Sequence, residues 1–390
     1  MKYTFLLLLG VTFNLQVHCQ IFTEKLKLVF AGDIMGHSTQ IKAALLPDGT
    51  YDYHHCFKYV APILKQADLA IGNLEFTLPG KPPYSGYPQF RSPDAVAVAL
   101  KEAGFDMLVT ANNHSNDAGR TGVENTIRTV RNLGFHQTGT FLDSMDRSLN
   151  YPLLIQHGNF NLAFLNYTYG TNGIPTKPPV IVNELDEKQM AADMEKARAS
   201  NPDAIIVMVH WGNEYQLVET SYQRQLAQKL FLWGAKVVIG SHPHVVQSIE
   251  QKLLTDSIRK GELTVVAYSL GNFISGQIKT YTDIGAMVEV ELEKELPFGS
   301  TCITRTQYIP VFRYVHRAPT SVKYYTLPAT LFSELNQRDP FPIPAYIKDK
   351  LKQDLKIIRP ILSKHGIPEK PVFPNLILPP IMKMETQKIN

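Results

Sequence analysis

Two histidines follow one apolar run of the sequence in a pattern suited to metal binding. The stretch "VVIGSHPHVVQ" (residues 237–247) leads from β-branched residues to His242 and His244, which flank Pro243. Proline fixes its own φ angle and favours a turn, and a turn at this point would bring both imidazoles together. Neutral imidazole is a common ligand of divalent metals. The stretch therefore suggests a metal site whose other ligands come from elsewhere in the chain.

Other polar side chains follow similar apolar runs, each typical of a strand buried on both faces. The side chains at these strand ends are Asp33, Asn73, Glu75, Asn113, His114 and His210. In open α/β sheets, ligands bind beyond the carboxyl ends of the strands. Carboxylates, carboxamides and imidazoles suit Mn, Zn or Fe, and we expect one or two such ions. Such a site can lower the pKa of a bound water molecule.

Each of these residues also has a plainer interpretation. Asp33 could cap the following segment, and Glu75 could form a surface salt bridge. His210 could be a hydrogen-bonded core histidine, and His242 and His244 could face solvent from a turn. We favour the metal hypothesis because all of these residues occupy the same kind of place, the end of a buried strand.

Strand and helix patterns alternate along most of the chain. Apolar residues recur at helical spacing in residues 92–104, 122–134, 186–200 and 221–235. This alternation predicts an α/β domain. Residues 285–295 and 301–316 instead alternate with a period of two and have no helix between them, which predicts an antiparallel edge or a second sheet.

The first 19 residues are typical of a secretory signal peptide. A positive charge at Lys2 precedes an apolar stretch, residues 5–13, that is too short to cross a bilayer. Cleavage would leave Gln20 as the first residue. The alternative is a lipoprotein acylated at Cys19, which the bulky His18 disfavours.

The rest of the chain is expected to form one main domain, residues 20–318, and an extension. Residues 319–390 are rich in proline and predict a C-terminal extension packed on that domain. The composition, with 44% hydrophobic residues, predicts a sizeable core. Cys56 and Cys302 could pair with each other in an oxidising compartment, but we expect them to be lone buried thiols. The net charge of +4 and the lack of a basic stripe with interleaved aromatics give no reason to expect nucleic acid as a partner.

Several motifs in order resemble one known family. They are "AGDIMGH", "ADLAIGNLEFTL", "AGFDMLVTANNHSNDAGRTG", "VHWGNEY", "VIGSHPHVVQ" and "AYSLGNFI". Together they resemble the CapA family of capsule-synthesis proteins, named for poly-γ-glutamate capsules, over residues 26–274. That family is similar to calcineurin-like metallophosphoesterases. The resemblance therefore implies a four-layer α/β/β/α sandwich.

The resemblance also implies a role for each strand-end residue. The implied metal ligands are Asp33, Asn73, Glu75, Asn113, His210, His242 and His244, and the implied general acid is His114. Asp117 is predicted as a second catalytic residue because it lies so close to Asn113 and His114 in the sequence. The motifs depart from the phosphoesterase pattern at Met35, which stands where a histidine ligand is usual. A thioether is a poor ligand for a hard cation, and His37 is the candidate replacement. The Asn73/Glu75 pair also replaces a bridging aspartate.

Three residues are predicted to contact the substrate. The guanidinium fork of Arg91 suits a carboxylate or a phosphate, although a surface ion pair is equally compatible with the sequence. Trp211, together with Tyr215, is expected to line the cleft, although aromatics near strand ends often only fill the core. The third residue is Asn272 in "SLGNF".

These features predict a metal-dependent hydrolase or transferase of metallophosphoesterase type that acts outside the cytoplasm. Its target would be an amide or phosphoester bond of a capsule or other surface polymer. The expected partners are an anionic surface polymer or its precursor and membrane-associated capsule machinery. The alternative is a non-enzymatic accessory protein for polymer assembly or export, which Met35 and the missing aspartate favour. A cytoplasmic phosphatase of small molecules would require that residues 1–19 are not a signal.

Overall fold

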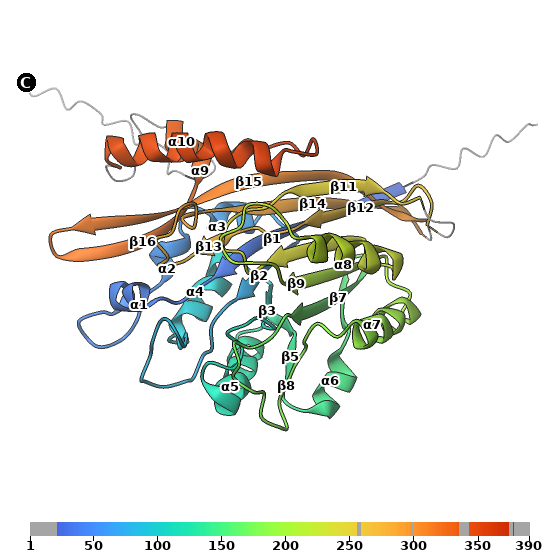
Figure 1. Cartoon of the computed structure of the whole chain (residues 1–390), viewed down its shortest axis with the longest axis horizontal. Coiled ribbons are helices and arrows are strands. Elements are labelled where there is room, and N and C mark those ends of the chain that lie inside the picture. Colours follow the sequence, from blue (N-terminus) through green and yellow to red (C-terminus); the bar gives the residue numbers. More distant parts are fainter. Residues whose placement is uncertain (1–21, 256–258, 298, 335–342, 374–376, 378–390) are drawn as a thin grey trace, which may run out of the picture.

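Two β-sheets lie face to face in the computed structural model of the protein (Figure 1). The structure describes residues 22–255, 259–297, 299–334, 343–373 and 377. The predicted signal peptide, residues 1–19, and the acylation alternative at Cys19 lie outside the described residues.

The larger sheet combines a parallel and an antiparallel part. In sheet order its strands are β16 (Ser321–Pro328), β15 (Thr301–Ala318), β14 (Ile284–Leu296), β1 (Phe22–Ile34), β2 (Leu69–Leu74), β3 (Met107–Val109) and β4 (His136–Thr138), with β13 (Asn272–Ile274) beside β1. Strands β1 to β4 and β13 run parallel, and β14 to β16 pair antiparallel. The antiparallel edge predicted from the period-two pattern is therefore confirmed.

The smaller sheet contains β9 (Ala204–His210), which ends at His210, and β10 (Val237–Ser241), which His242 and His244 follow. In order its strands are β11 (Ile249–Leu253), β12 (Leu263–Ala267), β10, β9, β7 (Phe160–Thr168) and β6 (Leu153–His157). Strands β7, β9, β10 and β12 are parallel. A separate pair joins β5 (Thr140–Phe141) to β8 (Ile181–Val182).

Helices connect and cover the sheets. They are α1 (Ser38–Ala44), α2 (His54–Phe57), α3 (Ala61–Leu64), α4 (Ala95–Ala103), α5 (Gly119–Asn132), α6 (Ser144–Asn150), α7 (Glu187–Ala199), α8 (Ser221–Leu232), α9 (Ala329–Glu334) and α10 (Ala345–Leu362). The four helices predicted from apolar spacing correspond to α4, α5, α7 and α8. Their ends show the expected chemistry. Asp186 and Thr220 accept backbone hydrogen bonds at the starts of α7 and α8, and α4 ends at Gly104 with φ 108°.

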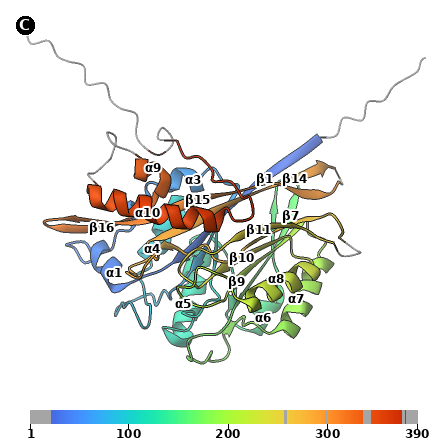
Figure 2. The same cartoon turned by 45° about the horizontal axis from the view of Figure 1, so that its top comes forward.

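Alternate residues of the smaller sheet face two different cores. On β9, Ile206 and Met208 belong to a cluster shared with the larger sheet, whereas Ile205 and Val207 belong to a cluster with α7 and α8. The first cluster also includes residues of α2, α3, α4 and α10. Figure 2 shows α10 lying along the antiparallel strands of the larger sheet. The order is thus helices, sheet, sheet, helices, which confirms the predicted four-layer sandwich.

The sheet extends beyond the predicted domain boundary. Strand β16 pairs with β15 in continuous register from Val311–Pro328 to Ala318–Ser321. The boundary placed between residues 318 and 319 therefore falls at the tip of a hairpin, and β16 is a strand of the main sheet. Helix α10 adds buried apolar residues to the same core, including Leu355 and Ile358.

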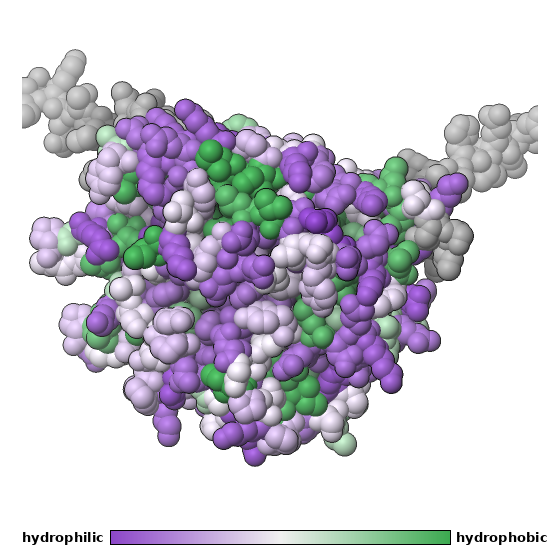
Figure 3. Space-filling model, viewed as in Figure 1, coloured by the Kyte–Doolittle hydropathy of each residue, from purple (hydrophilic) through white to green (hydrophobic). Residues whose placement is uncertain are grey.

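The surface is mostly hydrophilic on the face seen in Figure 3, where hydrophobic side chains form separate patches. Within the described residues, no helix combines the length and the apolar composition needed to cross a bilayer. Both described cysteines are free. Cys56 is buried as predicted, but Cys302 is exposed, so that prediction is wrong for Cys302.

Candidate metal centre

The predicted residues meet where the parallel strands of both sheets end. In the larger sheet, Asp33 of β1 lies opposite Asn73 of β2. In the smaller sheet, His210 of β9 lies opposite Ser241 of β10. Because the two sheets pack face to face, their carboxyl ends bring these side chains to one place.

A glycine allows the backbone to approach closely beside Asp33. A Cβ atom on Gly32 would lie 1.9 Å from the carbonyl oxygen of Gly271. The same oxygen accepts a hydrogen bond of 2.9 Å from the Asp33 backbone N–H. Gly32 therefore lets the segment that carries β13 pack directly against the end of β1 and fixes the position of Asp33.

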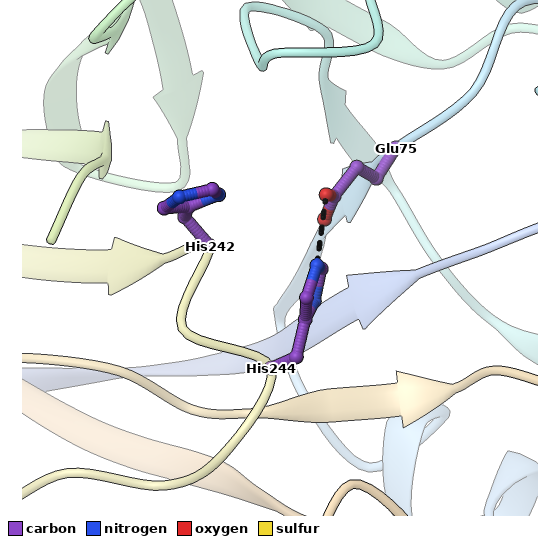
Figure 4. A group of neighbouring side chains, drawn as sticks. All are labelled: Glu75, His242 and His244. Atoms are coloured by element: carbon purple, nitrogen blue, oxygen red, sulfur yellow. Dashed lines mark ion pairs between the residues drawn. The ribbon is translucent and has the colours of Figure 1, made fainter. Parts of the chain in front are cut away.

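The turn at the His-Pro-His stretch is made by the histidines themselves. His242 has φ 98° and His244 has φ 59°, both in the left-handed region that non-glycine residues rarely adopt. Such conformations cost about 1–3 kcal/mol each and persist only where the surroundings impose them. Figure 4 shows the ring of His244 directed at Glu75, with His242 beside them. The predicted turn is present, with its unusual backbone angles at the two histidines on either side of Pro243.

Glu75 lies at the centre of the cluster. Its Oε1 is 3.6 Å from Nε2 of His210 and 3.6 Å from Nε2 of His244. Glu75, His242 and His244 form one group whose ligand atoms lie within 4.8 Å of one another, and Asp33, Glu75 and His210 form another. The two groups share Glu75, so its carboxylate stands between two sets of metal-type ligands.

The charges of this cluster fit a divalent cation. Glu75 is fully buried and its Oε1 has no hydrogen-bond partner. Burial and the nearby charge of Asp33 raise the pKa of Glu75 well above its usual value. Burial and the charge of His244 lower the pKa of His242 to about 3. A cation would favour the ionised carboxylate and the neutral imidazole at once.

The spacing fits as well. Metal–ligand bonds of about 2.1 Å in a tetrahedral site place the ligand atoms roughly 3.4 Å apart. Besides the two 3.6 Å contacts of Glu75, Nε2 of His210 lies 2.9 Å from Oδ1 of Asn113. Asn113 thus offers its oxygen toward the cluster, as a ligand would.

Asn73 was predicted to be a metal ligand, but its side chain instead forms hydrogen bonds to two of the other predicted ligands. Its amide nitrogen donates to Oδ1 of Asp33 at 2.9 Å and to Oε2 of Glu75 at 3.3 Å. Its oxygen accepts a hydrogen bond from Asn112 at 3.3 Å. Because the oxygen is turned away from the acids, Asn73 holds the two carboxylates in position and is not itself placed as a ligand.

Neither Met35 nor its candidate replacement, His37, joins the cluster. Met35 is buried in the hydrophobic core, where it is 2% exposed. Nδ1 of His37 accepts a hydrogen bond of 3.1 Å from the Gly276 backbone N–H, and burial followed by the charge of His244 lowers the pKa of His37 to about 4. Among the described residues, His37 belongs to neither group of potential ligands. The prediction that His37 replaces the missing histidine is not supported by this placement.

A second pair, His114 and Asp117, lies beside the cluster. Nδ1 of His114 is 2.7 Å from Oδ2 of Asp117, and both side chains are buried. The carboxylate also accepts a 2.5 Å hydrogen bond from the Phe90 backbone N–H. Asp117 therefore holds the His114 ring with hydrogen on Nδ1 and acts through His114 rather than by contact with a substrate.

A comparison with known protein families identifies the family of this chain. The family described as "Bacterial capsule synthesis protein PGA_cap" matches residues 27–277, which span every residue of the cluster. The chain belongs to this family.

Two curated relatives support the assignment to the PGA_cap family. The capsule biosynthesis protein CapA of Bacillus anthracis is 31% identical over 286 residues, which cover 69% of this chain and 64% of that relative. The PGA biosynthesis protein CapA of Bacillus subtilis (strain 168) is 29% identical over 254 residues, which cover 61% of each chain. This chain thus spans less than two thirds of the length of either relative.

Two solved structures show only a distant likeness to this chain. TT1561 of Thermus thermophilus has a TM-score of 0.37 at 8% identity, and the match covers 68% of this chain and 94% of that one. The 5'-nucleotidase from Candida albicans SC5314 has a TM-score of 0.40 at 11% identity, and the match covers 86% of this chain and 58% of that one. Likeness at this level carries no inference about activity.

The three residues predicted to contact substrate occupy different environments. Trp211 is fully buried in the cluster beneath α7 and α8 and donates its indole N–H to the Tyr268 carbonyl, so the prediction that it lines the cleft is wrong. Asn272 is buried and accepts a hydrogen bond at 3.1 Å from Nδ1 of His244, which makes it a positioning residue. The predicted companion of Trp211, Tyr215, does lie at the site, with its ring centroid 6.2 Å from that of His244.

Arg91 remains compatible with its prediction. It follows Phe90, whose ring centroid lies 4.5 Å from that of His114. Among the described residues, no carboxylate forms an ion pair with Arg91, and its buried Nε has no hydrogen-bond partner. A guanidinium without an ion-pair partner suits an anionic ligand, and the role of Arg91 in substrate binding stays a prediction.

Three further residues at the site were not predicted. Asn112 orients Asn73, and Oγ of Ser241 lies 2.9 Å from Nδ1 of His210. Tyr169 follows β7 and places its ring centroid 4.6 Å from that of His242. The sequence contained signals for all three. Asn112 is adjacent to Asn113, and Ser241 is adjacent to His242. Tyr169 ends the apolar run "NLAFLNYTY", which was not predicted as a strand.

Proposed function

We propose that this PGA_cap family member is a metal-dependent hydrolase or transferase that acts on an amide or phosphoester bond of a capsule or other surface polymer, outside the cytoplasm. The observation that carries the proposal is the buried Glu75 carboxylate, whose Oε1 has no hydrogen-bond partner and which two groups of ligand-type residues share. The names of the two relatives, a capsule biosynthesis protein and a PGA biosynthesis protein, support the capsule context.

The residues that would hold the metal are Asp33, Glu75, Asn113, His210, His242 and His244. A divalent cation there would supply a Lewis acid for a carbonyl or phosphoryl oxygen. Asn73, Ser241 and Asn272 would hold the ligands in place through the hydrogen bonds described above.

His114 would be the group that moves a proton. Asp117 accepts the hydrogen bond from Nδ1, which leaves Nε2 as the nitrogen that delivers a proton to a leaving group. Arg91 would bind an anionic part of the substrate. The proposed partners are an anionic polymer or its precursor and the membrane-associated proteins that assemble a capsule.

One observation favours a second candidate, a non-enzymatic accessory role in polymer assembly or export. The position that would complete the ligands around Asp33 is Met35, which faces the core and not the cluster. If the cluster holds no metal, the fold and Arg91 remain available for polymer binding.

Elemental analysis of purified protein, residues 20–390, tests the proposal. The wild type is compared with a His242→Ala/His244→Ala variant and with a control, His136→Ala/His157→Ala, whose histidines lie on β4 and β6 away from the cluster. We expect about one or two equivalents of Mn, Fe or Zn in the wild type and the control, and none in the first variant.

The result decides between the two candidates. Metal that depends on His242 and His244 leads to activity screens with γ-glutamyl amides and phosphoesters. A wild-type protein that holds no metal after reconstitution with Mn, Fe and Zn contradicts the hydrolase or transferase proposal and leaves the accessory role.

A further inference from the structure

A groove lies apart from the metal cluster, between α1 and the β15–β16 hairpin. It has a volume of about 700 Å³ and is lined by residues of α1, the loop after it and the hairpin tip. We call it the α1–hairpin groove. The proposed reaction uses none of its residues.

The charge of the α1–hairpin groove is entirely positive. Lys42 comes from α1, Arg317 from β15 and Lys323 from β16, and all three are exposed. No carboxylate is among the residues that line the groove. In the described part of the chain, none of the three cations forms an ion pair with an acidic side chain. Three unpaired cations in one hollow favour an anionic ligand.

The groove also offers apolar surface. Leu45 is 48% exposed and Leu46 is 41% exposed, and both line the hollow together with Val322. Cations beside aliphatic surface match a ligand that carries carboxylates on an aliphatic backbone. A γ-linked glutamate chain has this chemistry, because every repeat carries a carboxylate and a short run of methylene groups.

The groove is connected to the catalytic residues by a short path of side chains. Thr39 lines the groove and shares a 2.8 Å hydrogen bond with the hydroxyl of Tyr324. His37 lies two residues earlier, and its ring centroid is 4.8 Å from that of Phe90. Phe90 in turn contacts His114. The groove and the proposed proton donor are therefore linked through neighbouring packed side chains.

We propose that the α1–hairpin groove is a binding site for a carboxylate-bearing polymer chain, at a distance from the bond that reacts. The proposal rests on the proposed function for the class of ligand, but the groove itself is argued from its own residues. A concave site fits a chain better than an anionic membrane, which would bind protruding apolar side chains on a convex surface.

Binding of fluorescently labelled polymer, followed by anisotropy at two salt concentrations, tests the groove. The probes are a poly-γ-glutamate oligomer and a polygalacturonate oligomer, which carry carboxylates on different backbones. The groove variant is Lys42→Ala/Arg317→Ala/Lys323→Ala. Its matched control, Lys188→Ala/Lys252→Ala/Lys352→Ala, removes the same charge from exposed lysines on α7, β11 and α10.

We expect the groove variant to bind poly-γ-glutamate about tenfold more weakly than the wild type and with a smaller salt dependence, and the control to stay within about twofold. Binding of both polymers would support a general polycarboxylate site, and binding of poly-γ-glutamate alone would support a site selective for its backbone. Wild-type affinity in the groove variant, or an equal loss in the control, would overturn the proposal.

Two further arms distinguish a polymer site in the groove from binding at the metal cluster and from binding to a membrane. The His242→Ala/His244→Ala variant should bind the polymer as the wild type does, so a protein without metal that still binds polymer through the groove contradicts only the proposed reaction. Vesicles containing phosphatidylglycerol are the second arm. Groove-dependent binding to vesicles without polymer binding would overturn the polymer site in favour of a membrane surface.

Discussion

The buried carboxylate of Glu75 destabilises the folded protein when no cation is bound. Water is excluded from it, and its Oε1 has no hydrogen-bond partner among the described residues. A buried, unpaired acid costs folding free energy unless it is protonated or binds a cation. The imidazoles of His210 and His244 at 3.6 Å are the groups that would share this cation with it.

The first prediction concerns the pH dependence of stability in the metal-free protein. The pKa of His242 is lowered to about 3 by burial and the charge of His244, whereas an unfolded histidine titrates near 6.5. Between these values the unfolded state binds more protons, so wild-type stability falls as the pH decreases through this window. From pH 7 to pH 5, His242→Gln should gain about 2 kcal/mol in unfolding free energy relative to the wild type.

Urea denaturation of both proteins at pH 7 and pH 5, with a chelator present, measures this difference. Glu75 has its pKa shifted in the opposite sense, but it is present in both proteins and its effect largely cancels in the comparison. A difference in unfolding free energy that is the same at both pH values would contradict a neutral, buried His242.

The second prediction concerns the proton donor. In Asp117→Asn, an amide replaces the carboxylate that accepts the hydrogen bond from Nδ1 of His114. The ring loses its fixed tautomer, and we expect the rate to fall by about 10²–10⁴-fold on the substrate found in the activity screens. Metal content should remain at the wild-type level because Asp117 belongs to neither ligand group. Loss of metal, or an unchanged rate, would show that Asp117 does not act through His114.

At the scale of elements, the site depends on close backbone packing at strand ends. The end of β1 bears Asp33, and β13 pairs with it from Asn272, which holds His244. Two segments far apart in the sequence are thus joined directly by a backbone hydrogen bond, from the Asp33 N–H to the Gly271 carbonyl oxygen. Only a residue without a side chain fits between them, and this residue is Gly32.

The third prediction follows from this contact. A methyl group in Gly32→Ala would lie 1.9 Å from the Gly271 carbonyl oxygen, so β1 and β13 must separate. We expect a loss of about 3 kcal/mol or more in unfolding free energy, together with weaker metal binding because Asp33 and His244 move apart. Thermal unfolding and metal titration measure the two effects.

The matched control is Gly134→Ala, in the short loop between α5 and β4. Gly134 has φ 77° and open space around its Cβ position. The substitution should cost only about 1–2 kcal/mol of backbone strain and leave metal affinity unchanged. Equal metal affinities in Gly32→Ala and the wild type would show that the β1–β13 contact does not position the ligands.

At the scale of the molecule, the C-terminal segment is part of the folded body. Strand β16 completes the larger sheet, and α10 buries Leu351, Leu355, Ile358 and Leu362 in the core that joins the two sheets. The site lies at the edge of this shared core, so the packing of α10 and the geometry of the ligands are expected to be lost together.

The fourth prediction compares two neighbouring residues of α10. Leu355 is 1% exposed, whereas Ile357 is 46% exposed. Leu355→Ala should lower the unfolding free energy by about 2–5 kcal/mol, and Ile357→Ala should change it by less than about 0.5 kcal/mol. Far-ultraviolet circular dichroism and tyrosine fluorescence should report one shared transition. A separate early transition in Leu355→Ala would show that the C-terminal segment folds independently.

Local patterns in the sequence were enough to predict many of the helices and strand ends of the fold. The helices α4, α5, α7 and α8 were predictable because caps and apolar spacing are properties of neighbouring residues. The strand-end residues Asp33, His210 and His242 were predictable for the same reason, since each directly follows its own apolar run. The weaker runs of β7 and β16 were not identified, and with β7 the position of Tyr169 was missed.

The tertiary structure decided which of these residues meet and which do not. His244 and Asp33 are 211 positions apart, and only the packing of the two sheets brings them to 3.1 Å. The same packing buries the side chains of Met35 and Trp211 in the core and places Glu75 in both groups of potential ligands. The sequence shows which residue ends a strand. The direction in which that side chain points depends on strand register, sheet twist and backbone angles such as those of His242. Contacts with residues far away in the sequence impose these features.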